Sequence, residues 1–155
     1  MAEPDDPIYP MTDERKLVQL DGAYIAALGL AVFTFARCEW QAVWCCERIK
    51  PGALDKIVSK RMTAGQIAKH FADLVRNMPK SRKRGYLLGA SKEFTAIVDM
   101  RDRIVHGKPC TALDGAQRLN DANGIIETHD LEAAADAFTS CANRLNELFY
   151  GFLAR

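Results

Sequence analysis

Apolar residues recur at helical intervals along most of the chain and predict an all-α fold. The longest such stretch, residues 22–49, begins after Asp21 and ends before Pro51 and Gly52. Aspartate is a favourable residue at a helix start, whereas proline and glycine end helices. Because the first half of this stretch is apolar nearly all round, we expect a central helix of a bundle, or one that also packs on a second subunit.

A capping box marks the start of a second main helix. Residues 63–66 read Thr-Ala-Gly-Gln, and the threonine and glutamine side chains of such a box each bond a backbone N–H group of the other. The apolar residues that follow recur at helical spacing up to Met78, as on the buried face of a helix. A shorter helix is expected before it, over residues 53–60.

The third main helix carries apolar residues at helical spacing from Leu87 to Val105. We expect it to run to His106, with Gly107 and Pro109 ending it. Its last turns therefore hold the segment that also carries the candidate chemistry described below.

Helical spacing breaks down between residues 108 and 129. Short mixed segments here surround two dipeptides that favour tight turns, Asp114-Gly115 and Asn123-Gly124. The sequence therefore predicts a long loop or a small β-hairpin, and connections of this length often carry function.

A single helical domain is expected over residues 21–155. Asp130 is predicted to cap its final helix, whose apolar stripe extends to Phe152. Residues 1–20 hold three prolines among acidic groups and are expected to form a flexible N-terminal arm, with a short helix from Thr12. The predicted fold class is all-α, a bundle of four to five helices with the long loop or hairpin between the third and last main helices.

Composition and charge narrow the class of protein further. Hydrophobic residues make up 48% and charged residues 26% of the 155 residues, which is typical of a folded globular chain. The net charge of +1 gives no overall attraction to nucleic acid or to an anionic membrane, so any such binding has to be local.

The cysteines and the N-terminus favour a cytoplasmic protein without a membrane anchor. The five cysteines are odd in number and lack C-x-x-C spacing, which indicates a reducing compartment and neither a disulfide framework nor a zinc site. The N-terminus lacks the basic and apolar regions of a signal peptide. The uncharged stretch 22–36 is shorter than the ~20 residues that a membrane span needs, so we expect a buried core helix there.

Two charged residues interrupt the apolar stripes of the helices. Arg101 lies seven residues after Phe94, four after Ile97 and three before Ile104, and a guanidinium on that face must be paired or must face a cleft. Glu39 interrupts the stripe of the first helix in the same way. Two interpretations remain open: a structural ion pair, or an arginine that a carboxylate holds in place for work on an anionic group.

His106 closes the third helix beside Gly107. A helix C-terminus favours a protonated imidazole, and the glycine leaves space for a ligand. A histidine beside an arginine suits phosphodiester cleavage, because the histidine moves a proton near neutral pH while the arginine stabilises charge on the phosphate. RNA brings its own nucleophile, the 2′-hydroxyl, so neither a metal nor a cofactor is needed. The simpler alternative is that His106 only caps the helix.

The segment from Arg101 to Gly107 reads Arg-Asp-Arg-Ile-Val-His-Gly and resembles the R-x(4–6)-H motif of the HEPN superfamily, the higher eukaryotes and prokaryotes nucleotide-binding domains. Four residues separate the arginine from the histidine, and the polar Asp102 follows the arginine, as in many members. The resemblance extends loosely over residues 22–153 and is closest to bacterial members with toxin or defence roles.

The resemblance implies a homodimer whose two motif helices form a shared cleft. Arg101, His106 and Asp102 would act there on RNA as a metal-independent endoribonuclease, with Glu39 as an orienting group. Such members are often held in check by an antitoxin or another regulatory protein. Others keep the bundle without cleaving RNA, so a non-catalytic module that binds a partner protein or a nucleotide is the alternative.

A basic segment precedes the third helix and adds a candidate substrate contact. Lys80, Arg82, Lys83 and Arg84 follow one another closely in a predicted loop. They form either a phosphate-contact patch for an RNA substrate or a solvated surface loop.

Aromatic residues and the remaining histidines give weaker signals. Phe33, Trp40 and Trp44 on the first helix could stack bases, but their helical spacing favours core or dimer contacts. His70 and His129 have no companions at ligand spacing, and no metal site is assigned to them.

Overall fold

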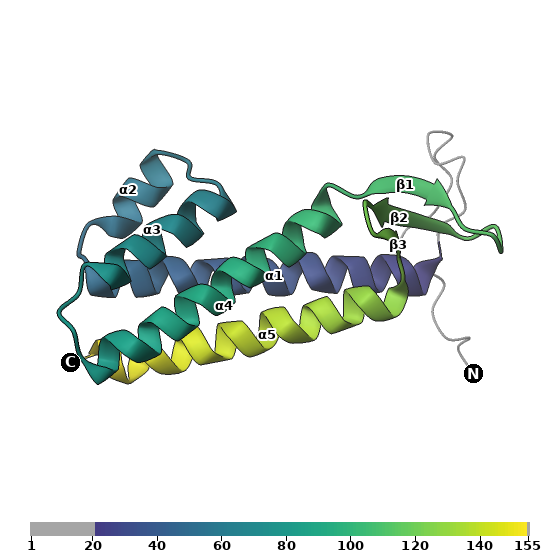
Figure 1. Ribbon diagram of the computed structural model, residues 1–155. Coiled ribbons are helices and arrows are strands. Elements are labelled where there is room, and N and C mark those ends of the chain that lie inside the picture. The colour runs from purple at the N-terminus through teal and green to yellow at the C-terminus, as the bar shows by residue number, and fades with distance from the viewer. Residues whose placement is uncertain (1–20, 155) are drawn as a thin grey trace, which may run out of the picture.

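In the computed structural model the described residues are 21–154, so the predicted arm over residues 1–20 and its short helix from Thr12 lie outside them. The chain forms a helical bundle, as predicted, with a small sheet after the fourth helix. The helices are α1 (Gly22–Ile49), α2 (Ala53–Ser59), α3 (Ala64–Arg76), α4 (Arg82–Val105) and α5 (Thr128–Tyr150), followed by the 3-10 turn η1 (Phe152–Ala154). In Figure 1, α1, α4 and α5 run along the length of the molecule, with α2 and α3 at one end and the sheet at the other.

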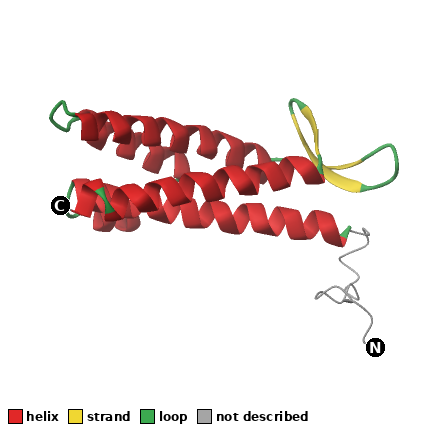
Figure 2. Cartoon of the chain, turned by 90° about the horizontal axis from the view of Figure 1, so that it is seen from below, coloured by secondary structure: helices red, strands yellow, loops and turns green. Residues whose placement is uncertain are grey.

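The sheet is antiparallel, with strand order β1-β2-β3, and Figure 2 shows it gathered at one end of the helices. Its strands are β1 (Lys108–Thr111), β2 (Gln117–Asp121) and β3 (Gly124–Ile126). Both predicted turn dipeptides lie between strands, and Gly115 and Gly124 have φ angles of 85° and 124°, a region that favours glycine. The short segments between residues 108 and 129 are therefore two linked hairpins.

Two of the predicted helix starts are confirmed at the level of hydrogen bonds. The Asp21 carboxylate accepts from the Ala23 N–H group at the start of α1. The predicted capping box is present at the start of α3, with Thr63 and Gln66 each accepting a bond from the other's backbone. These caps satisfy N–H groups that have no partner inside the helix.

Several predicted boundaries were wrong by a few residues. Asp130 is not the N-cap of α5: the N-cap is Glu127, three residues earlier, and the Asp130 carboxylate accepts from the Glu127 N–H group at 2.8 Å. Phe152 lies beyond the end of α5, and Met78 lies beyond the end of α3. The third main helix, α4, ends at Val105, one residue before the expected His106.

The core lies between α1, α5 and the two helices that flank them. Phe35 of α1 meets Phe138 of α5 edge to face, with ring centroids 5.4 Å apart, and Phe71 of α3 meets Phe94 of α4 at 6.4 Å. Four of the five cysteines are also buried here, on α1 and α5: Cys38, Cys45, Cys46 and Cys141.

A single tyrosine fastens the sheet to the helices. The Tyr24 hydroxyl donates to the Ile126 carbonyl at 2.8 Å and accepts from the Leu119 N–H group at 3.0 Å. The guanidinium of Arg118 lies 4.5 Å from the centre of the same ring. One side chain of α1 therefore bonds a backbone group in β2 and another in β3, and so joins the sheet to the helices.

We expect Tyr24→Phe to destabilise the protein by about 1–3 kcal/mol, because it leaves two buried backbone groups without partners. Urea unfolding followed by circular dichroism measures the change, and hydrogen exchange is expected to rise first in β2 and β3. Tyr150→Phe, at an exposed position, is the matched control. Equal stability of the Tyr24→Phe and wild-type proteins would contradict this role.

One face of α1 is not covered by the rest of the described chain. We call it the outer face; its large side chains are 37–69% exposed and are Leu30, Val32, Phe33, Trp40 and Trp44. Residues 22–36 thus form a core helix on one face only: Tyr24, Ala31 and Phe35 are buried, whereas the outer face is exposed. Among residues 21–154, only α1 is long and apolar enough to span a membrane, by length and composition alone, and buried helices of water-soluble bundles pass the same test.

Candidate functional site

Arg101 lies on the core-facing side of α4, as its spacing predicted. Its Nη1 donates to Asp102 Oδ1 at 2.8 Å, and the guanidinium carbon lies 5.2 Å from the centre of the Phe35 ring on α1. The side chain nevertheless stays 33% exposed. Since α3 has 13 residues and α4 has 24, α3 lies along only the first part of α4 (Figure 1).

The carboxylate that holds Arg101 is that of Asp102, not that of Glu39. Among the described residues, Asp102 is the one carboxylate that forms an ion pair with Arg101 within 4 Å. Burial raises the pKa of Glu39 above its ordinary value of 4.5, and the nearby Arg101 charge lowers it by a smaller amount. Glu39 thus acts on Arg101 through space, as a partly desolvated carboxyl group.

The raised pKa of Glu39 predicts a particular dependence of stability on pH. A carboxyl group that binds its proton more tightly in the folded state favours folding most below its unfolded pKa of 4.5, and this contribution is lost as pH rises through the folded value. We expect Glu39→Gln to be less affected, so that its stability relative to wild type increases between about pH 4 and pH 7.

Urea midpoints measured across that pH range test the prediction. Glu132→Gln, at an exposed position of α5, is the matched control. A stability of Glu39→Gln that falls relative to wild type with rising pH would show that attraction to Arg101 outweighs burial.

His106 ends α4 and its side chain is exposed. Its backbone N–H group donates to the Asp102 carbonyl at 3.0 Å. Because α4 continues to Val105, the five steps from Arg101 to His106 turn the side-chain direction by ~140°. A single chain therefore places Arg101 toward the bundle and His106 toward solvent, and does not bring the two side chains together.

Gly107 serves packing and does not leave the expected space for a ligand. A Cβ atom at this position would lie 3.1 Å from Leu119 Cβ and 3.1 Å from the Ile104 carbonyl oxygen. The residue is therefore small because β2 passes close to the end of α4.

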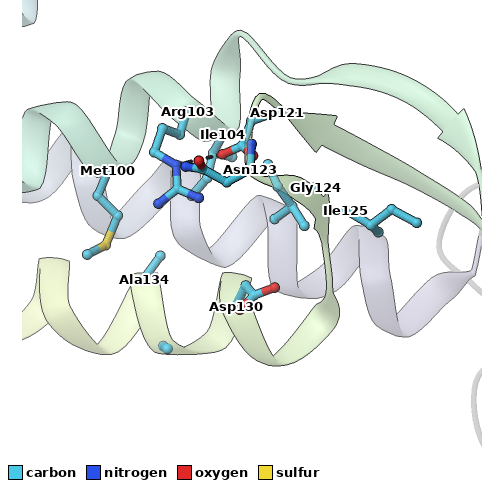
Figure 3. A pocket seen from close by; sticks show the side chains of 11 residues that line it. Met100, Arg103, Ile104, Asp121, Asn123, Gly124, Ile125, Asp130 and Ala134 are labelled. Carbon is cyan, nitrogen blue, oxygen red and sulfur yellow. Dashed lines mark hydrogen bonds and ion pairs between the residues drawn. The ribbon is translucent and has the colours of Figure 1, made fainter.

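A cavity of 390 Å³ lies beside the end of α4, between the sheet and the start of α5 (Figure 3). It is lined by Arg103, whose Nε donates to Asp121 Oδ2 at 2.6 Å. This bond and the Asn123 N–H group lower the pKa of Asp121. Neither Arg101 nor His106 is among its lining residues, so the cavity belongs to the contact between helix and sheet.

The basic residues near the start of α4 do not share a site with Arg101 and His106. Arg82, Lys83 and Arg84 lie in the first turn of α4, not in a loop as expected, while Lys80 precedes the helix. At ~1.5 Å per residue, the length of α4 separates them from His106 by ~35 Å. Arg84 also has a structural role, since its guanidinium donates to the Val75 and Arg76 carbonyls at the end of α3.

Within residues 21–154 there is no group of three or more histidine, cysteine, aspartate or glutamate side chains that could hold a metal ion. His129 is exposed and lies 3.4 Å from Asp130. Burial and nearby lysines lower the pKa of His70, which favours its neutral form.

Comparisons with known proteins do not indicate a function for the chain. No family model, no curated protein and no solved structure matches the chain. What the protein does therefore has to be inferred from the residues at the end of α4 and from the exposed surfaces.

Proposed function

We propose that the protein is a HEPN-like, metal-independent endoribonuclease that acts as a homodimer on RNA in a bacterial toxin or defence system. The observation that carries the proposal is the placement of Arg101. A charged side chain on the core side of α4 is held by Asp102 at 2.8 Å and remains 33% exposed, so it can reach an anionic group. The motif's histidine is exposed at the end of the same helix.

In the proposed reaction, the His106 imidazole takes the proton of a 2′-hydroxyl group of RNA. The 2′-oxygen then attacks the adjacent phosphorus atom, and the bond from phosphorus to the 5′-oxygen breaks. A second His106, from the other chain of the dimer, gives the leaving 5′-oxygen its proton. Arg101 stabilises the charge on the phosphorane, and Asp102 keeps the guanidinium in place. The products are a 2′,3′-cyclic phosphate and a 5′-hydroxyl group.

The incomplete site of one chain is the reason for proposing a dimer. The outer face of α1 is a surface that another copy can cover, but it points away from Arg101, which packs on Phe35 on the covered side of α1, so this contact does not itself join the two motifs. The small residues Gly29 and Ala36 lie near Phe33 and Trp40 along this face, so ridges of one copy can enter grooves of another. Its five large side chains expose apolar area on the order of 500 Å² per chain, a large part of the roughly 800 Å² that a standard interface buries on each partner. A second copy of the chain is therefore the proposed occupant.

Cleavage of a labelled RNA pool in EDTA tests the reaction. We expect wild-type protein to cut the RNA, and we expect His106→Ala and Arg101→Ala to lower the rate by about 100-fold or more. The matched controls are His129→Ala, at an exposed histidine, and Arg103→Ala, which removes the arginine bonded to Asp121.

Both controls are expected to keep near wild-type rates, and circular dichroism checks that all four variants fold. Equal loss in the two arginine variants would indicate damage to the helix and no special role for Arg101. Intact RNA with pure wild-type protein would remove the catalytic claim.

Light scattering coupled to size exclusion tests the dimer. We expect wild-type protein to elute as a dimer and Phe33→Glu to elute as a monomer, because a carboxylate in the centre of an apolar interface is left without a partner. Val58→Glu, at a 54% exposed position of α2, is expected to stay dimeric. A monomeric wild-type protein would contradict the proposed interface.

The second candidate is a non-catalytic helical module that binds a partner protein, such as an antitoxin or another regulator, or a nucleotide. Two observations favour it: Arg101 and His106 diverge within one chain, and the outer face of α1 is exposed. Intact RNA in the cleavage assay together with a monomeric wild-type protein would place this candidate ahead of the nuclease.

A further inference from the structure

Aromatic side chains gather at the end of the bundle away from the sheet. They line a hollow of 770 Å³ between the start of α4 and the end of α5, and we call them the aromatic end patch. The patch consists of Tyr86, Tyr150 and Phe152, whose exposed fractions are 48%, 69% and 43%. Aromatic rings left this open to water are unusual in a chain whose other phenylalanines mostly pack in the core.

The patch is held in a defined arrangement. The Tyr86 and Phe152 rings stack with centroids 5.3 Å apart and an angle of 20° between their planes. Gly151 permits this, since a Cβ atom there would lie 2.9 Å from the Glu147 carbonyl oxygen. The glycine thus lets the chain leave α5 and turn into η1, which brings Phe152 against Tyr86. Because both rings remain partly exposed, a flat ligand can extend the stack.

Basic side chains lie beside the patch. Lys83 lines the hollow, together with Arg144 and the acidic Glu147, and Lys80 and Arg82 lie within three residues of Lys83. Arg144 is paired with Glu93 at 2.7 Å.

The basic residues in the first turn of α4 lie where positive charge lowers the stability of a helix. The first turn of α4 contains no acidic residue, although the positive end of the helix dipole favours acidic side chains there and disfavours basic ones. Arg84 is explained by its bonds to the end of α3, whereas the fold does not explain Arg82 and Lys83. Backbone N–H groups at a helix start and nearby cations together attract a phosphate.

We propose that the aromatic end patch binds single-stranded nucleic acid, with bases stacking on Tyr86, Tyr150 and Phe152 and phosphates contacting Lys83 and Arg82. Single-stranded binding surfaces combine these two features, ring faces for bases and cations along the backbone. The inference goes beyond the proposed nuclease and holds without it, since binding requires neither Arg101 nor His106.

The patch and the motif are far apart on α4. At ~1.5 Å per residue, the 24 residues of α4 span ~36 Å. A stacked strand rises ~3.4 Å per nucleotide, so one strand would need roughly ten nucleotides to reach both places on the same chain. A shorter oligonucleotide isolates the patch from the motif.

Fluorescence anisotropy of a labelled 2′-O-methyl RNA heptamer tests the proposal, because this probe lacks the free 2′-hydroxyl group and cannot be cleaved by the proposed reaction. We expect Tyr86→Leu and Phe152→Leu each to raise Kd about fivefold or more, since stacking contributes strongly to each base bound. Lys83→Gln is expected to reduce the slope of log Kd against log salt by about 0.7, as for one lost phosphate contact.

Lys60→Gln, at an exposed lysine after α2, is the control for charge and is expected to leave Kd unchanged. Absence of heptamer binding, or equal binding by Tyr86→Leu and wild type, would overturn the proposal. An oligoglutamate peptide of equal charge that competes as well as the heptamer would also overturn it, because it offers charge without bases and would indicate an acidic protein partner. These outcomes are independent of the cleavage assay, so either proposal can fail alone.

Discussion

The burial of one face of α1 against α5 is the interaction on which the rest of the structure depends. Phe35 and Phe138 meet at its centre, and α1 also contacts α2, α3, α4 and η1. The helices that pack on α1 cover only part of its surface, and they leave the outer face exposed to solvent. Because α1 is apolar on both sides, one face builds the core and the outer face offers a surface for a second chain.

The lengths of the other helices decide what can happen at the motif. Since α3 is shorter than α4 and lies along only its first part, Arg101 keeps contact with solvent although it lies on the core side. Since α4 stays helical to Val105, Arg101 and His106 diverge. The site of one chain is thus accessible and oriented but incomplete, which is the physical reason for linking its chemistry to a dimer.

Local patterns predicted most of the fold, because caps, turn dipeptides and apolar spacing act over a few residues. The same spacing placed Arg101 on the core side of α4. Its partner could not be predicted, since adjacent residues on a helix do not normally face each other, yet Asp102 folds back to Arg101. Contacts distant in sequence also gave no local signal: Leu119 against Gly107 and Phe152 on Tyr86 appear only once the chain is folded.

The reactivity of the buried cysteine thiols reports whether the helical bundle is closed or open. Burial raises the pKa of Cys45 and Cys46 to about 12. A hydrogen bond with Cys141, together with burial, raises the pKa of Cys38 above its usual range. The thiolate is the form that attacks an alkylating reagent, so these thiols stay unreactive while α1 and α5 remain paired. Only the half-buried Cys110, on the sheet, is accessible before that pairing breaks. Labelling of Cys110 alone therefore indicates an intact bundle, whereas labelling of the other four cysteines indicates that the bundle has opened.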